Sequence, residues 1–112
     1  MLSKELMKGT VRPIVLKLLS ERERMYGYEI TQHVRELSNE KIQLTEGALY
    51  PLLHKMEADG WLITERERVN GRLRKYYRLS SLGTAVAGEQ LTQVRDFLTT
   101  LQHILNPKPG TL

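Results

Sequence analysis

Residues 45–61 read TEGALYPLLHKMEADGW, and the rest of the chain is organised around this stretch. Its apolar side chains recur at the spacing of one helix face; they are Leu49, Leu52, Leu53 and Met56. Thr45 is a good N-cap residue, and Asp59-Gly60 is typical of a helix end. We therefore predict a helix over residues 45–59. Its other face is aromatic and basic with few other charges; it carries Gly47, Tyr50, Pro51, His54 and Lys55.

A β-hairpin is predicted after this helix, because the apolar pattern changes to period two beyond Gly60. Asn70-Gly71 is the strongest short hairpin signal and suits a type I′ turn. A two-residue loop pairs Val69 with Arg72 and fixes the register of both strands. In that register one face near the base is assigned to the core; it carries Leu62, Thr64, Tyr77 and Leu79. We expect Trp61 to be an apolar anchor at the base.

The hairpin carries basic side chains toward its tip, namely Arg66, Arg68, Arg72, Arg74 and Lys75. Glu65 and Glu67 dilute this charge on the first strand, so we expect the basic edge mainly on the turn and the returning strand. A short helix followed by a basic hairpin is typical of a winged helix-turn-helix, in which a recognition helix enters the major groove of DNA. The other interpretation is an ordinary amphipathic helix beside a solvated hairpin, since motif matches include false positives.

Two helices are predicted before the central one. Residues 4–20 read as helical, because Leu6, Thr10, Ile14 and Leu18 fall at every fourth position and form a mainly apolar stripe, which Pro13 interrupts. Either this helix bends at Pro13, or Thr10 caps a fresh start and Pro13 lies in the first turn, where no backbone N–H is needed. We favour a single bent helix.

The second helix is expected to follow a polar connection over residues 20–25 and to begin at Tyr26-Gly27-Tyr28. It should end near Ser38, and its inward side chains should be Ile30, Val34 and Leu37. Alternation of apolar and polar residues at 42–44 then predicts a very short strand that leads into the central helix.

A last helix is expected from Ser80 or Ser81 to about Leu105, where Pro107 stops it. Its apolar residues recur in alternating three- and four-residue steps, the pattern of a helix that pairs with another helix. One small domain cannot cover so long an apolar stripe, so we expect a homodimer formed through this helix. The residues predicted at the dimer contact are Leu91, Val94, Leu98, Leu101 and Leu105.

The composition argues against several classes of function. The chain has 112 residues, the size of one domain, and 17 Lys and Arg against 13 Asp and Glu give a net charge of +4, which mildly favours a polyanionic partner. It has no cysteine, and its 3 histidines fall on separate predicted helices, so we expect no disulfide, metal site or cofactor.

Neither a phosphate-binding glycine loop nor a nucleophile elbow occurs, so we expect no enzyme. No apolar run approaches the ~20 residues of a membrane span, so we expect a cytoplasmic protein with no membrane partner.

The order of these segments resembles the PadR family of bacterial transcriptional regulators over about residues 5–105. The most specific motifs are Gly27-Tyr28, Leu49-Tyr50-Pro51, Gly60 and residues 71–79. The resemblance implies a mainly α (α+β) fold, a winged helix-turn-helix with a two-stranded wing. It assigns residues 1–80 to the DNA-binding domain, residues 81–106 to a C-terminal dimerisation helix in the same compact unit, and residues 107–112 to a tail. The single last helix looks like the short branch of the family.

The resemblance also implies a homodimeric repressor that binds an inverted-repeat operator in double-stranded DNA. The resemblance places most of the following residues at the DNA, and we add His54 because it lies on the exposed face of the central helix. The full set is Thr45, Gly47, Tyr50, Pro51, His54, Lys55, Asn70, Gly71, Arg72, Arg74 and Lys75. Release by a small apolar or aromatic effector is a further hypothesis, with a site at the dimer centre near Val94, Phe97 and Leu101. The last helix lacks the tryptophans that drug-binding relatives use. The alternative function is a winged-helix protein–protein interaction module without specific DNA binding.

Overall fold

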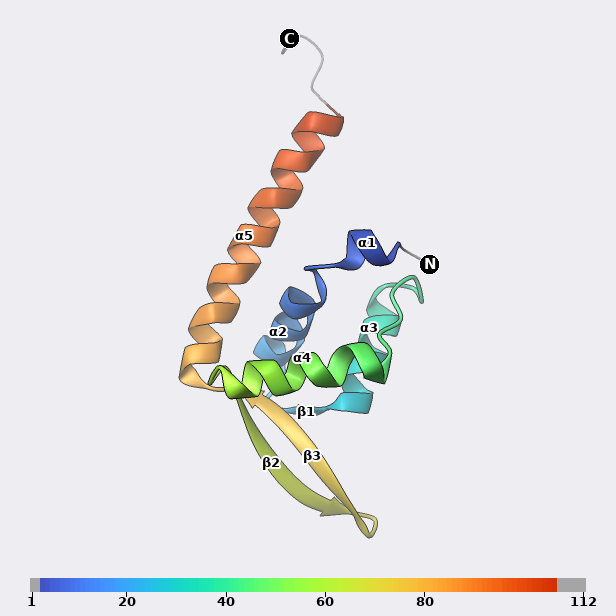
Figure 1. Ribbon diagram of the computed structural model, residues 1–112, viewed down its shortest axis with the longest axis vertical. Coiled ribbons are helices and arrows are strands. Elements are labelled where there is room, and N and C mark those ends of the chain that lie inside the picture. The colour runs from blue at the N-terminus through green and yellow to red at the C-terminus, as the bar shows by residue number, and fades with distance from the viewer. Residues whose placement is uncertain (1–2, 107–112) are drawn as a thin grey trace.

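The computed structural model describes residues 3–106, which form a set of helices and one small sheet (Figure 1). In chain order the elements are α1 (Lys4–Met7), α2 (Val11–Glu21), β1 (Met25–Tyr26), α3 (Gly27–Leu37), α4 (Glu46–Ala58), β2 (Leu62–Val69), β3 (Arg72–Leu79) and α5 (Ser81–Leu105). The sheet is antiparallel with the strand order β1-β3-β2. The predicted fold class is confirmed: helices dominate, β2 and β3 form the wing, and α5 is the long last helix. The predicted tail at residues 107–112 lies outside the described residues.

The core lies where α2, α3 and α4 meet the base of the wing. Its largest fully buried side chains are Tyr77, Leu16, Met25, Ile30, Leu49, Leu53, Met56 and Val15. Each helix contributes residues three or four positions apart, so each buries one face and leaves the other in water. From this core the wing and α5 extend in opposite directions, as Figure 1 shows. Among the described helices, none combines the length and apolar character that crossing a membrane requires.

The prediction of one bent helix over residues 4–20 is wrong. The helix stops at Met7, and Gly9 adopts a φ of +88°, a left-handed conformation that breaks the helical path. Thr10 stands at the N-cap position of α2 and donates its hydroxyl to the carbonyl of Met7 at 2.6 Å. Pro13 is therefore in the first turn of α2, where its missing N–H leaves no helical bond unmade, and its ring is buried. The alternative of a fresh start at Thr10 is correct, although the Thr10 side chain makes no capping hydrogen bond to α2.

Two smaller predictions also fail in this region. Residues 42–44 form no strand; instead the amide of Ile42 donates to the hydroxyl of Ser38 at 3.0 Å, in an irregular connection. The edge of β3 is occupied by β1, which pairs Met25 with Tyr77. Leu37 was expected inside but is 66% exposed, because the last turn of α3 extends beyond the core that buries Ile30 and Val34.

The predicted hairpin register is confirmed. Val69 pairs with Arg72 across the turn, and Asn70 and Gly71 have φ angles of 50° and 79°, both in the left-handed region that a type I′ turn requires. At the base, Leu62 pairs with Leu79, and Tyr77 is buried.

Helix α5 is fixed to the base of the wing by its first turn. Ser80 caps it by accepting the amide of Gly83 at 3.0 Å, as predicted. The amide of Ser80 donates to the carbonyl of Trp61 at 2.9 Å, and Trp61 packs partly buried against the core. A Cβ built on Gly83 would lie 2.0 Å from that carbonyl oxygen, so only glycine fits here. Trp61 is thus the predicted anchor, and its backbone positions α5.

Candidate nucleic-acid interface

Helix α4 presents one face to solvent. Thr45 caps it by accepting the amide of Ala48 at 3.2 Å, and Leu49, Leu53 and Met56 point into the core. The opposite face holds the positions that were expected at DNA. Of these, Gly47, Pro51, His54 and Lys55 are exposed, and Tyr50 is half-buried. The helix continues through Pro51 from Glu46 to Ala58 without interruption. The sequence therefore identified both faces of this helix.

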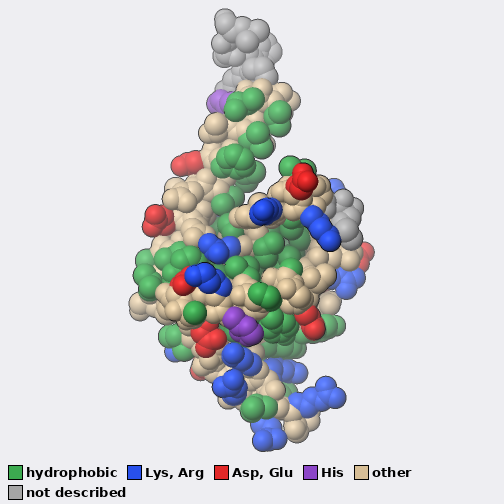
Figure 2. Space-filling model, in the orientation of Figure 1, with side chains coloured by type: hydrophobic (Ala, Val, Ile, Leu, Met, Phe, Trp, Pro, Cys, Tyr) green, Lys and Arg blue, Asp and Glu red, His purple; other side chains and the backbone are tan. Residues whose placement is uncertain are grey.

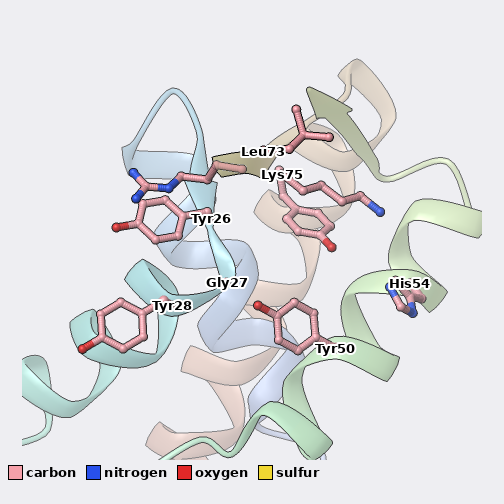
Figure 3. A pocket seen from close by; sticks show the side chains of 9 residues that line it. Tyr26, Gly27, Tyr28, Tyr50, His54, Leu73 and Lys75 are labelled. Carbon is pink, nitrogen blue, oxygen red and sulfur yellow. The ribbon is translucent and has the colours of Figure 1, made fainter. Parts of the chain in front are cut away.

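Tyr50 lies against the start of α3. A Cβ built on Gly27 would be 2.3 Å from the Tyr50 hydroxyl oxygen, so the phenol contacts the backbone of the first residue of α3 (Figure 3). Burial raises the pKa of Tyr50 above its ordinary value, and the Glu46 carboxylate raises it further. The phenol is thus neutral near pH 7, and it joins the two helices of the helix-turn-helix.

The wing has two faces of different electrostatic character, because successive residues of a strand point to opposite sides. We call the inner face the side of the wing turned toward α4. It carries Thr64, Arg66, Arg68, Leu73, Lys75 and Tyr77. The outer face carries Glu65, Glu67, Val69, Arg72, Arg74, Tyr76 and Arg78. Glu57 of α4 holds the inner face of the wing against the helix. Its carboxylate accepts a hydrogen bond from the Thr64 hydroxyl at 3.2 Å and lies 3.6 Å from the Lys75 ammonium.

The acidic residues of the wing are paired on the outer face. Glu67 is hydrogen-bonded to Arg24, which precedes β1, and Glu65 lies 3.3 Å from the Nε of Arg78. The guanidinium of Arg24 also lies 3.9 Å from the centroid of the Tyr76 ring. Its hydrogen bond to Glu67 raises the pKa of Arg24. These contacts neutralise much of the outer face and bind it to β1.

The inner face is basic and carries no acidic side chain of the wing. Arg66 and Arg68 are exposed there beside Lys75, and neither forms an ion pair with any of the described residues. The expectation that Glu65 and Glu67 dilute the basic edge is therefore wrong for this face. Arg66 and Arg68 were missing from the predicted site, although strict alternation with the two glutamates already separates them. Figure 2 shows Lys and Arg side chains gathered over the wing.

A cavity of about 320 Å³ lies between the start of α3, helix α4 and strand β3 (Figure 3). Tyrosine rings and basic side chains make up most of its lining, which consists of Tyr26, Gly27, Tyr28, Tyr50, His54, Leu73, Arg74, Lys75 and Tyr77. Tyr26 and Tyr28 were not among the predicted site residues. Arg74, which was, has its guanidinium 4.1 Å from the centroid of the Tyr26 ring.

The residues predicted for dimerisation and for an effector lie on α5. Leu91 and Val94 line an apolar groove of about 630 Å³ between α2, α3 and α5. Leu98, Leu101 and Leu105 lie beyond it, with 52%, 36% and 67% of their surfaces exposed. Of the predicted effector residues, Val94 lines this groove, whereas Phe97 is 63% exposed.

Within the part of the chain that the structure describes, no three His, Cys, Asp or Glu side chains gather in a way that could hold a metal ion. The site consists of an exposed helix face, a basic wing face and the cavity between them. These parts come from α4, from β2 and β3 of the wing and from the start of α3.

The comparisons with known proteins agree with this arrangement. Residues 15–89 match the model of the transcriptional regulator PadR-like family. A transcriptional regulator of Mycobacterium tuberculosis, Rv3488, is 37% identical over 86 residues, covering 77% of each chain. A PadR family transcriptional regulator of Eggerthella lenta has a similar crystal structure, with a TM-score of 0.76 at 31% identity, over 93% of this chain and 88% of that one. A transcriptional regulator of Clostridium thermocellum gives a TM-score of 0.79 at 26% identity, over 94% and 100% of the two chains. The resemblance seen in the sequence is confirmed: the chain belongs to the PadR-like family of transcriptional regulators.

Proposed function

We propose that this regulator is a homodimeric repressor that binds an inverted-repeat operator through α4 and the wing. The observation that carries the proposal is the inner face of the wing, where Arg66, Arg68 and Lys75 extend beside the exposed face of α4. Cations held on one side of a hairpin can neutralise successive phosphates, and release of counterions makes such binding favourable at low salt. Helix α4, which lies beside these cations, is then held at the major groove of the DNA.

Within this surface the residues divide into two roles. Lys55, Arg72, Arg74 and Lys75 contact phosphates, together with the newly found Arg66 and Arg68, and Asn70-Gly71 forms the tip of the wing. Thr45, Gly47, Tyr50, Pro51 and His54 lie at the groove. Few of these side chains read base edges strongly, so phosphate contacts and DNA shape carry much of the specificity.

The dimer is supported by the apolar surface of α5. Phe97, Leu98, Ile104 and Leu105 are each more than half exposed, and this surface continues into the groove at Leu91 and Val94. A contiguous apolar face of this kind is typical of an interface. In this arrangement residues 1–80 bind DNA and residues 81–106 join the two copies, in one compact cytoplasmic protein. Release by an apolar or aromatic effector near Val94, Phe97 and Leu101 stays a hypothesis about the dimer.

A selection of duplexes from a random-sequence pool tests the proposal. We expect an enriched inverted repeat whose half-sites are centred about one helical turn, roughly 34 Å, apart. Affinity for the selected duplex and for a random one should both fall steeply with salt, with the selected duplex bound more tightly. The double variant Arg72→Ala/Lys75→Ala should bind all sequences more weakly, with a shallower salt dependence. If wild-type protein shows no salt-dependent duplex binding, the alternative of a protein–protein interaction module replaces this function.

A further inference from the structure

Two arginines connect the outer face of the wing to β1, and they reach in opposite directions. Arg24, just before β1, extends across β3: its guanidinium lies 3.9 Å from the centroid of the Tyr76 ring and is hydrogen-bonded to Glu67 of β2. Arg74 of β3 extends the other way, with its guanidinium 4.1 Å from the centroid of the Tyr26 ring. The two rings meet edge to face, with their centroids 5.6 Å apart. We call these five side chains the brace: Arg24, Tyr26, Glu67, Arg74 and Tyr76.

The strand register shows that the brace replaces a simpler pairing within the wing. Glu67 and Arg74 lie directly opposite each other on β2 and β3. Opposite charges at such positions ordinarily attract each other. Within the described chain, however, Glu67 is paired with Arg24, and Arg74 lies over Tyr26. Both charged side chains of the wing are thus engaged by β1, so these contacts attach the wing to the rest of the protein.

The outer half of the wing has few other attachments. Strands β2 and β3 bury only Leu62 and Tyr77, and β1 pairs with only two residues of β3. Beyond that point the wing is a two-stranded hairpin, which on its own is marginally stable in water. On the inner face, Glu57 of α4 contacts Thr64 and Lys75. The brace is the corresponding attachment on the outer face.

The two ends of the brace lie at the inner cations and at the helix-turn-helix. Glu67 stands between Arg66 and Arg68 in β2, so fixing its side chain against β1 also fixes the two cations on the opposite face. At the other end, Tyr26 is the N-cap residue of α3, and its amide donates to the Glu29 carboxylate at 3.1 Å. The brace therefore connects the inner cations to the start of α3.

We propose that the brace sets the orientation of the wing before DNA is bound, and that its members are positioning residues for Arg66 and Arg68. This inference rests on the proposed function and refines it. A wing that is already ordered avoids the loss of conformational entropy that ordering during binding would cost. A guanidinium stacks on a ring through its face and keeps N–H groups at its edge. Arg74 can therefore belong to the brace and still contact a phosphate.

The experiment compares Glu67→Ala with the control Glu65→Ala on the duplex selected from the random pool. Each change removes one outer-face carboxylate and one ion pair, but Glu65 pairs with Arg78, outside the brace. By charge alone, each should strengthen DNA binding, because the wing loses a negative charge. We expect this for Glu65→Ala, whereas Glu67→Ala should weaken binding about fivefold, because its wing must be ordered on binding. The melting temperatures of the two variants should be alike, since both ion pairs are exposed.

A second comparison tests whether the brace acts through the inner cations. Arg66→Ala/Arg68→Ala is introduced into wild type, into Glu67→Ala and into Glu65→Ala. The loss of affinity should be full in wild type and in Glu65→Ala, and about fivefold smaller in Glu67→Ala, because a disordered wing contributes less. An equal loss in all three would contradict the positioning role.

Relaxation of the backbone amides of residues 66–73 in the free protein measures the order of the wing itself. Order parameters of about 0.85, as in a rigid backbone, are expected in wild type and in Glu65→Ala, and values near 0.6 in Glu67→Ala. The amides of α4 should be alike in all three proteins. A merely stabilising ion pair would leave the wing amides of Glu67→Ala as rigid as those of wild type, which would overturn the proposal.

A change at Tyr26 tests the other end of the brace. Tyr26→Leu removes the ring over which Arg74 lies and should reproduce the weaker binding and the mobile wing of Glu67→Ala. Tyr26→Phe keeps the ring and should restore both properties. If Glu67→Ala and Glu65→Ala bind the duplex alike, the positioning role is wrong and the regulator function stands. If no duplex is selected at all, the proposed function has failed, and the role of the brace in DNA binding fails with it.

Discussion

Gly27 and Tyr50 meet in one contact that joins the two helices of the helix-turn-helix. The phenol of Tyr50 occupies the space that a Cβ at position 27 would need, at 2.3 Å from its hydroxyl oxygen. Because this atom is the end of a side chain, Gly27→Ala should displace the ring and cost about 1–2 kcal/mol of unfolding free energy. In a Tyr50→Leu background the same change should cost at least about 0.5 kcal/mol less. Urea unfolding of the four proteins measures this coupling; strictly additive effects would mean that the two residues act independently.

At Gly83 an added side chain would meet backbone atoms, which cannot move aside as the Tyr50 side chain can. A Cβ there would lie 2.0 Å from the carbonyl oxygen of Trp61, which also accepts the amide of Ser80. Gly83→Ala should therefore destabilise the protein by about 3 kcal/mol. Gly88, on the same helix, has no neighbour within 4 Å of an added Cβ, so Gly88→Ala should stabilise by about 0.5–1 kcal/mol. Thermal unfolding at one fixed protein concentration checks both, and equal effects would contradict the role of Trp61.

At the scale of elements, strand alternation separates the charges of the wing. Arg66 and Arg68 lie on the inner face, whereas Arg78 lies on the outer face and pairs with Glu65 at 3.3 Å. Arg66→Ala/Arg68→Ala should lower the slope of log affinity against log salt by about two, one for each lost phosphate contact. The control Arg78→Ala should leave that slope unchanged. A larger effect from Arg78 than from the inner pair would contradict the phosphate contacts proposed for Arg66 and Arg68.

Elements with a strong local pattern were predictable, and those fixed by tertiary contacts were not. The turn at Asn70-Gly71 and the cap at Thr45 follow from local chemistry, and both lie where the sequence placed them. The break at Gly9 depends on a left-handed residue that a periodic pattern does not reveal. Strand β1 is only two residues long and exists because Met25 pairs with Tyr77 on a distant strand.

At the scale of the whole molecule, the candidate site was predictable only in part. The exposed face of α4 follows from helical spacing, because the same period defines the core. The cavity does not, since Tyr28, Tyr50 and Tyr77 are brought together by three different elements. Tyr77 was correctly assigned to the core from its strand face, but its place in the cavity lining could not be read from the strand pattern.

The assembly of two copies depends on the outer half of α5, where the apolar face has no cover within the described chain (Figure 2). Leu98 lies on that face and is 52% exposed, while exposed Thr100 points to nearly the opposite side of the helix. A buried, unpaired carboxylate is strongly unfavourable at an apolar contact. We therefore expect wild type to sediment as a dimer at micromolar concentration and Leu98→Glu to sediment as a monomer.

The control Thr100→Glu adds the same charge and should stay dimeric. Loss of the dimer should also remove most operator affinity, because two half-sites bound by linked recognition helices gain from a high effective concentration. Binding to a duplex with a single half-site should change much less in Leu98→Glu, which separates loss of assembly from loss of the DNA surface. A wild-type protein that is monomeric under these conditions would contradict the dimer, and equal dissociation by Thr100→Glu would contradict its location on this face.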